Sequence, residues 1–249
     1  MGLIQSDFFI CLDCETTGLD PSIDRIIEIA VAKFTLNEVL ESYETLIDPQ
    51  MPIPESSTAI HHITLEMVSG KPIIADVLPN ILKMVEGHII IGHGIGLDIE
   101  FIRKEAERHQ VPCRITFHQT IDTLRLARLY GESPVNSLER LREHFNIANE
   151  GAHRAMNDVL VNIEVFKYLC NSFKTTQQLL KRLESPILMR MMPLGKYKGR
   201  LFADIPVEYL QWAQHKDFDQ DLLFSIRSEL KKRRQGNLFK QASNPFSEL

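Results

Sequence analysis

The stretch FFICLDCETTG, residues 8–18, starts as a short apolar run and then places two carboxylates, Asp13 and Glu15, one residue apart. An apolar run that contains aromatic residues is typical of a buried strand. Because alternate residues of a strand point to the same face, both carboxylates project one way and Cys14 projects the other. Two neighbouring carboxylates resist joint ionisation unless a cation lies between them. The stretch therefore indicates either a site for a hard cation such as Mg²⁺ or a pair of solvated acids at a strand end.

The segments that follow this strand predict the rest of an α/β fold. Apolar runs predict strands at 26–36, 39–47 and 88–92, and a tight turn at Asn37-Glu38 makes an antiparallel meander of the first three strands. Apolar residues at helical spacing predict helices that cover a central mixed sheet. The expected helices span residues 75–87, 97–109, 120–130, 136–145 and 155–170.

Length and composition are those of a globular protein with one full domain and a smaller appendage. The chain has 249 residues, of which 44% are hydrophobic and 24% are charged. It has no run of about 18 apolar residues and no basic segment followed by an apolar core, so we expect neither a membrane partner nor a signal peptide. Its four cysteines are widely scattered, which favours reduced thiols and a cytoplasmic location.

Charge is divided unevenly along the chain. Residues 1–185 carry 17 Lys and Arg against 26 Asp and Glu, whereas residues 186–249 carry 11 against 7. An acidic body followed by a basic end fits a metal site and a separate contact with a polyanion, although two ordinary solvated surfaces give the same balance. A stretch rich in Pro, Gly and Met near residue 185 marks a boundary. The predicted parts are a domain at 1–176, a small basic module at 186–234 and a tail at 235–249.

Three further residues bear on whether Asp13 and Glu15 form a cation site or a pair of solvated acids. Asp98, in the segment HGIGLDIEFI, lies at the expected start of a helix, where a carboxylate stabilises the helix end without any ligand. His153 and Asp158, in the segment GAHRAMNDV, come just before and just inside the last long helix of the predicted domain. Each of the three, taken alone, fits an ordinary capping or surface residue.

Together these segments resemble the DEDDh family of 3′–5′ exonucleases, to which the epsilon proofreading subunit of DNA polymerase III, ribonuclease T and oligoribonuclease belong. The resemblance covers about residues 7–170, with the motifs in the family's order and at family-like spacing. The matching segments are DCETTGLD (13–20), AIHHITLEMV (59–68), HGIGLDIEFI (93–102), IDTLRLAR (121–128) and HRAMND (153–158). The resemblance implies a ribonuclease H-like fold, with a mixed five-stranded sheet flanked by helices.

The resemblance also implies the roles of individual residues. Two divalent cations, Mg²⁺ or Mn²⁺, are expected to bind four carboxylates, and an imidazole is expected to act as the general base for water. The implied ligands are Asp13, Glu15, Asp98 and Asp158, the implied base is His153, and Thr16, Leu19 and His61 match positions that hold the substrate. The chain has His62, Gly94 and Leu97 where the family usually has Gly, Asn and Phe, and none of these departures removes a ligand. We interpret Asp122 as a helix cap rather than a ligand.

The activity implied by the resemblance is metal-dependent 3′–5′ hydrolysis of DNA, in proofreading or repair, at a single-stranded or frayed 3′ end. An RNA-trimming 3′–5′ exoribonuclease and a non-catalytic nucleic-acid-binding module are the alternatives. The sequence does not locate a contact with the 2′-hydroxyl that separates RNA from DNA. A non-catalytic copy has no chemical need for all five motif residues, which favours an enzyme. The sequence leaves open whether the chain is a polymerase subunit or a stand-alone enzyme. It also leaves the oligomeric state open, and a homodimer is one expectation because dimers occur in this family.

The segment MPLGKYKGRLFADIPVEYLQWA (192–213) resembles a small module of unknown role, the DUF3820 type, that is often appended to nucleic-acid enzymes. Basic residues interleaved with an aromatic between Gly195 and Gly199 suit contacts with a single nucleic-acid strand. The apolar residues of the segment predict a small core of their own. Its expected members are Leu201, Phe202, Ile205, Tyr209, Leu210 and Trp212.

The end of the chain holds a short motif, QGNLF, in polar surroundings. Residues Gln235–Phe239 resemble the linear motif that docks on the bacterial beta sliding clamp. The alternative is that this tail packs onto its own module. The preceding basic run, KKRR at 231–234, would steer the tail to DNA.

Overall fold

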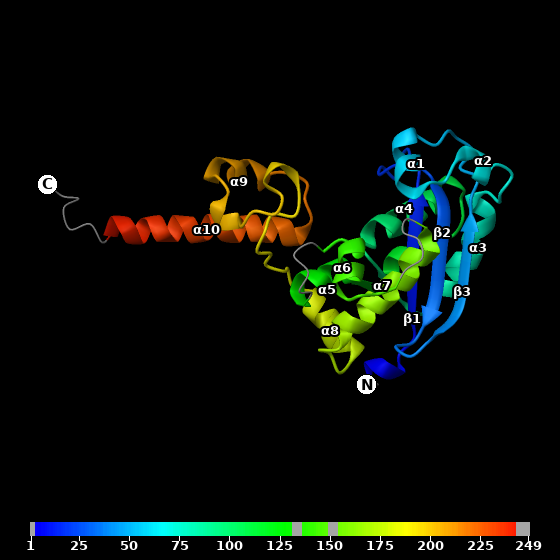
Figure 1. Ribbon diagram of the computed structural model, residues 1–249, viewed down its shortest axis with the longest axis horizontal. Helices are drawn as coiled ribbons and strands as arrows, with labels where there is room; N and C mark the ends of the chain where they lie inside the picture. Colours follow the sequence, from blue (N-terminus) through cyan, green and yellow to red (C-terminus); the bar gives the residue numbers. More distant parts are fainter. Residues whose placement is uncertain (1–2, 131–135, 149–153, 243–249) are drawn as a thin grey trace. The chain divides into compact units, whose positions relative to one another are not determined.

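The structure is a computed structural model that describes residues 3–130, 136–148 and 154–242, with the backbone alone described at 130 and at 236–242. The chain forms two compact units, residues 1–182 and 183–249 (Figure 1). The predicted general base, His153, lies outside the described residues.

Strands and helices of the first unit follow one another much as the sequence pattern predicts. The strands are β1 (Phe9–Thr16), β2 (Ile26–Phe34), β3 (Val39–Leu46), β4 (Ile89–Gly92) and β5 (Thr120–Asp122). The α-helices are α1 (Glu55–His61), α2 (Leu65–Val68), α3 (Ile74–Val85), α4 (Gly96–Arg108), α5 (Thr123–Tyr130), α6 (Leu138–His144), α7 (Ala155–Cys170) and α8 (Thr176–Leu183). Short 3₁₀ helices are η1 (Ile4–Ser6) and η2 (Ile115–Phe117).

The strands form one mixed sheet in the order β3-β2-β1-β4-β5. The first three strands are antiparallel, as predicted, whereas β4 and β5 are added in parallel. These features confirm the predicted ribonuclease H-like α/β fold, with a five-stranded sheet flanked by helices (Figure 1). The predicted helix at 120–130 was wrong at its start, since residues 120–122 form β5. Pairing with β4, a contact between distant segments, decides the conformation of these three residues.

The two faces of the sheet pack against different helices. On one face, Phe9 of β1 and Phe34 of β2 lie against Phe166 of α7, with ring centroids 5.3 and 6.1 Å apart. On the other face, Leu12 belongs to a core formed with α3 and α4. Cys14 packs against that second core, as predicted from the alternation along the strand. β1 is therefore covered on both sides, with α7 on the face that continues toward the two carboxylates.

The second unit is a small helical module around a core of its own. Its elements are η3 (Gly195–Tyr197), η4 (Phe202–Asp204), α9 (Val207–Ala213) and α10 (Gln220–Ala242). The buried core consists of Met192, Phe202, Ile205, Leu210, Ala213, Leu222, Ile226 and Leu230. In the described residues, no helix has both the length and the apolar character that crossing a membrane demands.

One prediction for this unit was wrong. Leu201 and Trp212 were expected in the small core, but they are 50% and 51% exposed. The residues from 235 to 242, which belong to the predicted tail, continue helix α10. Arg233, in the basic run expected to steer that tail, donates to the carbonyl oxygens of Phe202 and Ala203 at 2.8 and 2.9 Å, so it anchors α10 to the module.

Candidate active site

Three of the four predicted metal ligands converge where β1 meets α7. Phe9 and Cys11 contact α7, and the alternation along β1 carries Asp13 and Glu15 onto the same face. Asp158 lies in the first turn of α7. Asp13, Glu15 and Asp158 each offer a carboxylate oxygen, and these oxygens all lie within 4.8 Å of one another. A strand and a helix far apart in the sequence thus build one acidic cluster.

The fourth predicted ligand, Asp98, is held at the same end of the sheet by the backbone of β1. β4 pairs with β1 only from Phe9 to Cys11, so the N–H of Cys14 extends beyond the last pair. Asp98, in the first turn of α4, accepts this N–H at 3.0 Å. Asp98 therefore accepts a hydrogen bond from β1 beyond the end of the parallel pairing with β4. Its oxygens are not part of the group within 4.8 Å.

Crowding of these acids changes their protonation. Burial raises the pKa of Asp13 well above its ordinary value, and neighbouring carboxylates, led by Asp98, raise it further. The pKa of Glu15 rises to about 7 through burial and the charge of Asp158. Burial also raises the pKa of Asp98 to about 7. Without a cation, the cluster holds protons that ordinary carboxylates would have released.

The donor set at this site fits hard divalent cations. All four side chains are carboxylates, and oxygen is the ligand that Mg²⁺ and Mn²⁺ prefer. A cation among the oxygens would relieve the repulsion that raises these pKa values. The residues present are therefore suited to the metals implied by the sequence.

Glu28, which the sequence analysis missed, fixes the start of α7. It lies on β2 directly opposite Glu15 and is 2% exposed. Its carboxylate accepts Nε and Nη2 of Arg154 at 2.6 to 3.1 Å, and the backbone N–H of Ala155 at 3.0 Å. Arg154 and Ala155 are the residues at which the HRAMND segment enters the helix that carries Asp158. The available signal was an acidic residue between the apolar residues of a buried strand, which requires a partner.

The loop after β1 holds two of the predicted substrate residues. Thr16 donates its hydroxyl hydrogen to the carbonyl oxygen of Gly18 at 2.6 Å, and Leu19 is 80% exposed. Asp24 closes the loop, because its carboxylate accepts the hydroxyl of Thr17 at 3.0 Å. A Cβ at Gly18 would overlap the Asp24 carboxylate, so a larger residue would displace that side chain. The loop is thus a tight structure that presents Leu19 to solvent.

The third predicted substrate residue, His61, is buried in the structure. Its side chain is 2% exposed, and its Nδ1 accepts the N–H of Ile63 at 3.0 Å. The structure therefore does not place this ring on the surface beside Leu19. His62 follows as the C-cap of α1 with φ 60°, a left-handed conformation that favours glycine. This position is where the family usually has Gly, so the departure at His62 places a side chain on a strained backbone.

The second motif departs from the family at a position with similar backbone demands. Gly94 has φ 78°, and both glycine and the family's asparagine tolerate this region. Its N–H is accepted by Asp122 at 3.0 Å, and Asp122 also accepts the N–H of Leu124 at 2.9 Å. The interpretation of Asp122 as a cap of the helix is confirmed. The ring of His93 contacts the hydroxyl of Thr123 at 3.1 Å, which ties the motif to α5.

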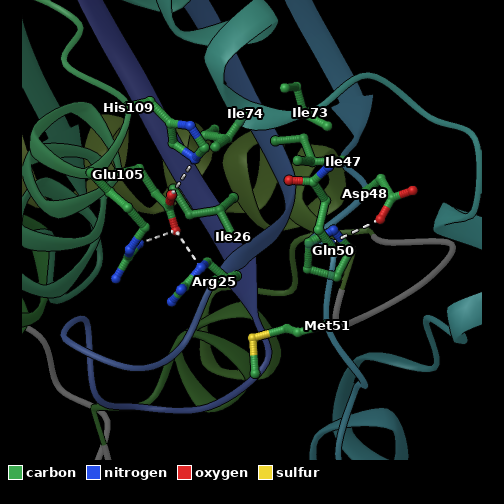
Figure 2. A pocket seen from close by; sticks show the side chains of 12 residues that line it. Arg25, Ile26, Ile47, Asp48, Gln50, Met51, Ile73, Ile74, Glu105 and His109 are labelled. Carbon is green, nitrogen blue, oxygen red and sulfur yellow. Dashed lines mark hydrogen bonds and ion pairs between the residues drawn. The ribbon is translucent and has the colours of Figure 1, made fainter.

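A pocket of about 210 Å³ lies apart from the acidic cluster, since none of the four predicted ligands lines it (Figure 2). Glu105 of α4 is fully buried at its edge, with Arg108 at 2.7 Å, His109 at 3.6 Å and Arg25 at 4.0 Å. Arg108 also donates to the carbonyl oxygens of Pro21 and Ser22, at 3.2 and 3.1 Å. This cluster braces the loop that carries Leu19, which gives it a structural role.

Comparisons with known proteins match both units. A family model described as Exonuclease (RNase_T) matches residues 10–166, and one described as "Putative quorum-sensing-regulated virulence factor" matches residues 177–227. The chain is 32% identical over 173 residues to DNA polymerase III PolC-type of Clostridium perfringens, covering 69% of this chain and 12% of that protein. It is 31% identical over 159 residues to DNA polymerase III subunit epsilon of Aquifex aeolicus, covering 64% of this chain and 78% of that protein.

A solved structure shares the fold as well. Exonuclease X in complex with 5′ overhanging duplex DNA is 25% identical and superposes with a TM-score of 0.55, covering 70% of this chain and 98% of that one. The family model over the second unit does not bear the DUF3820 name, so that resemblance stays a prediction. The first family model spans more than half of the chain and contains all four predicted metal ligands. The chain therefore belongs to the exonuclease family.

Proposed function

We propose that this chain is a metal-dependent 3′–5′ exonuclease that hydrolyses DNA phosphodiester bonds from the 3′ end. The observation that carries the proposal is the cluster in which Asp13, Glu15 and Asp158 present oxygens within 4.8 Å of one another. Asp98 is bonded to the same strand. A cation among these carboxylates would lower the cost of ionising them together, and perturbed carboxylates of this kind cluster at functional sites.

Asp13, Glu15, Asp98 and Asp158 are the residues that would hold two divalent cations, which we propose to be Mg²⁺. Such cations supply an activated water and a stabilised leaving oxygen in phosphodiester hydrolysis. The chain contributes these ligands from β1, α4 and α7, and Glu28 fixes the position of α7 relative to β1 through its contacts with the start of the helix. Rigid placement of the ligands removes an entropic cost from the reaction.

His153 is assigned the proton transfer from water, on the strength of its place in the HRAMND motif. An imidazole has a pKa near the working pH, which suits a general base. Arg154, the next residue, is held by Glu28, and this contact supports the assignment because it fixes the point where the motif enters α7. Leu19, which is 80% exposed, offers an apolar contact for the terminal base, and Thr16 shares its loop.

We propose DNA rather than RNA as the substrate because the names of the similar proteins refer to DNA. The similar proteins are a subunit and a PolC-type form of DNA polymerase III, and the solved neighbour holds duplex DNA with an overhang. The chain spans only 12% of the PolC-type relative, so nothing else of that protein is carried over. We assign the activity to the predicted domain at 1–176, acting on a single-stranded or frayed 3′ end.

Partners and location remain predictions of the same proposal. The predicted partners are a polymerase, a sliding clamp bound through Gln235–Phe239, and a second copy of the chain. The predicted location is the cytoplasm. Gln235 lies in α10, so a clamp contact would use a helical segment or require it to unwind. The cysteines are free, in keeping with a reducing compartment.

The proposal is tested by digesting single-stranded DNA, mismatched duplex DNA and RNA side by side, with Mg²⁺ or Mn²⁺. We expect cleavage of both DNA substrates and a higher kcat/KM on DNA than on RNA. A preference for RNA would support the exoribonuclease alternative. Binding without cleavage of any substrate, at every metal concentration, would show a non-catalytic module.

A further inference from the structure

The second unit carries a surface formed by residues that take no part in the acidic cluster. We call it the aromatic–basic surface. Its members are Lys196, Tyr197, Arg200, Tyr209, Trp212 and Lys216. They come from the Gly-rich turn around η3, from α9 and from the residues just after α9.

Three aromatic rings form the centre of this surface. Tyr197 and Tyr209 meet edge to face with centroids 4.7 Å apart, and Tyr209 lies 5.3 Å from Trp212. Helix α9 explains the grouping, since its positions 209 and 212 are three residues apart and share a face. Leu210 and Ala213 of the same helix are fully buried. The helix therefore separates a core side from an aromatic side.

Trp212 is not part of the module's core. Tyr197 and Tyr209 pack along the edge of that core, but Trp212 is 51% exposed. A large aromatic side chain is usually buried when the fold allows it, because burial removes apolar area from water. Its exposure beside two other rings marks a contact surface.

The conformation of the Gly-rich turn places the ring of Tyr197 against Tyr209 of α9. The turn is closed by backbone hydrogen bonds between Met192 and Arg200 at 2.9 Å, and between Gly199 and Met192 at 2.8 Å. Gly195 and Gly199 both have positive φ, of 73° and 80°. A Cβ at Gly195 would come within 3.1 Å of the hydroxyl oxygen of Tyr209, so glycine also permits close packing there.

Cations lie against these rings. Lys196 and Arg200 lie 5.5 and 5.7 Å from the centroid of Tyr197, and Lys216 lies 4.7 Å from that of Trp212. All three cationic residues are exposed. Among the residues that the structure describes, none of the three forms a salt bridge. Their charge is therefore available to an anionic ligand.

We propose that the aromatic–basic surface is a binding site for single-stranded DNA, separate from the exonuclease site. Ring faces stack on bases only where the bases are unpaired, and exposed cations beside them match the phosphates. A duplex offers phosphates but hides its base faces. The choice of DNA over RNA rests on the proposed function, whereas the single-stranded character rests on the rings themselves.

Trp212 is the one tryptophan in the sequence, so its fluorescence reports on this surface alone. The test titrates an oligo-dT of about 20 nucleotides into the full chain in EDTA, with binding followed independently by anisotropy of a labelled oligonucleotide. We expect saturable quenching of Trp212 that coincides with binding. Trp212→Ala should weaken binding about 10-fold, and Trp212→Phe should restore most of it, because phenylalanine still stacks.

The matched control is Phe224→Ala, which removes another exposed aromatic of the same unit and should leave binding unchanged. Lys196→Gln with Arg200→Gln should lower the slope of log affinity against log salt by about 1.4. Binding of oligo-dT with no change in fluorescence and no effect of Trp212→Ala would overturn the proposal. So would dependence on Trp212 for oligo-rU but not for oligo-dT.

Cleavage assays separate this proposal from the proposed function. Trp212→Ala should cleave a trinucleotide at the wild-type rate and lose activity only on long strands, through a raised KM. If the wild-type chain cleaves nothing but binds oligo-dT through Trp212, the exonuclease proposal fails and the surface stands. If Trp212→Ala cleaves and binds long strands like the wild type, the surface fails and the exonuclease stands.

Discussion

Replacing Glu28 by glutamine tests whether a buried carboxylate positions the helix that carries Asp158. Glu28 is 2% exposed and accepts Arg154 on one side and the Ala155 N–H on the other. The amide of glutamine keeps one acceptor and turns the other oxygen into a donor, which then faces one of these donors. Loss of one charge-assisted hydrogen bond costs about 2 kcal/mol.

The stability cost of Glu28→Gln stays at about 2 kcal/mol because Arg154 is partly exposed to water. Its side chain is 44% exposed, so water solvates the guanidinium after the change. The larger penalty for stranding an unpaired charge in the interior does not apply. Loosening of the first turn of α7 should lower kcat about 10- to 100-fold, with little change in KM, because Asp158 moves relative to β1.

Urea unfolding and steady-state cleavage of labelled single-stranded DNA measure the two effects. Glu164→Gln is the matched control, since Glu164 lies on the same helix, is 46% exposed and pairs with Lys167 at 2.7 Å. That control should change stability by less than about 0.5 kcal/mol. If Glu28→Gln matches the control in unfolding midpoint and in kcat, Glu28 has no positioning role.

Three further predictions concern the same unit. In EDTA, the free energy of unfolding should fall as pH rises from about 4.5 to 7. The cause is that Glu15 and Asp98, whose pKa values are raised to about 7, bind more protons in the folded chain than in the unfolded chain. A rising or flat profile of stability against pH from thermal melts would contradict this. Asp13→Asn should stabilise the metal-free chain at pH 8 by about 1 kcal/mol, because it removes one of the crowded carboxylates. It should also abolish cleavage and the stabilisation by Mn²⁺, and thermal melts that still respond to Mn²⁺ would argue against the ligand assignment. His62→Gly should raise stability by about 0.5–1 kcal/mol in urea unfolding, since φ is 60° at that position, and a loss of stability would show that the side chain contributes more than the strain costs.

Local rules account for much of what the sequence predicts correctly. The spacing of Asp13 and Glu15 fixes their common face, because strand geometry has a period of two. Helix α7 was predicted with its observed bounds, since its apolar spacing spans four turns. Asp122 was recognised as a cap because capping depends on neighbouring residues only.

What the sequence did not reveal depends on partners far along the chain. Glu28 and Arg154 are 126 residues apart, so the apolar run of β2 indicates a buried charge but not what that charge binds. The three residues of β5 become a strand only beside β4. Trp212 was assigned to a core from its apolar character, yet the face of α9 that is buried depends on how the Gly-rich turn folds back onto it.

The central claim is that the acidic cluster at β1 and α7 drives metal-dependent removal of nucleotides from a 3′ end. The most direct measurement is a time course of the full chain on single-stranded DNA labelled at its 5′ end, with Mg²⁺, with EDTA, and with Asp13→Asn in Mg²⁺. The account predicts a ladder that shortens from the 3′ end in Mg²⁺ only. An intact strand in Mg²⁺, an early release of the 5′ label, or an equal ladder from Asp13→Asn would contradict it.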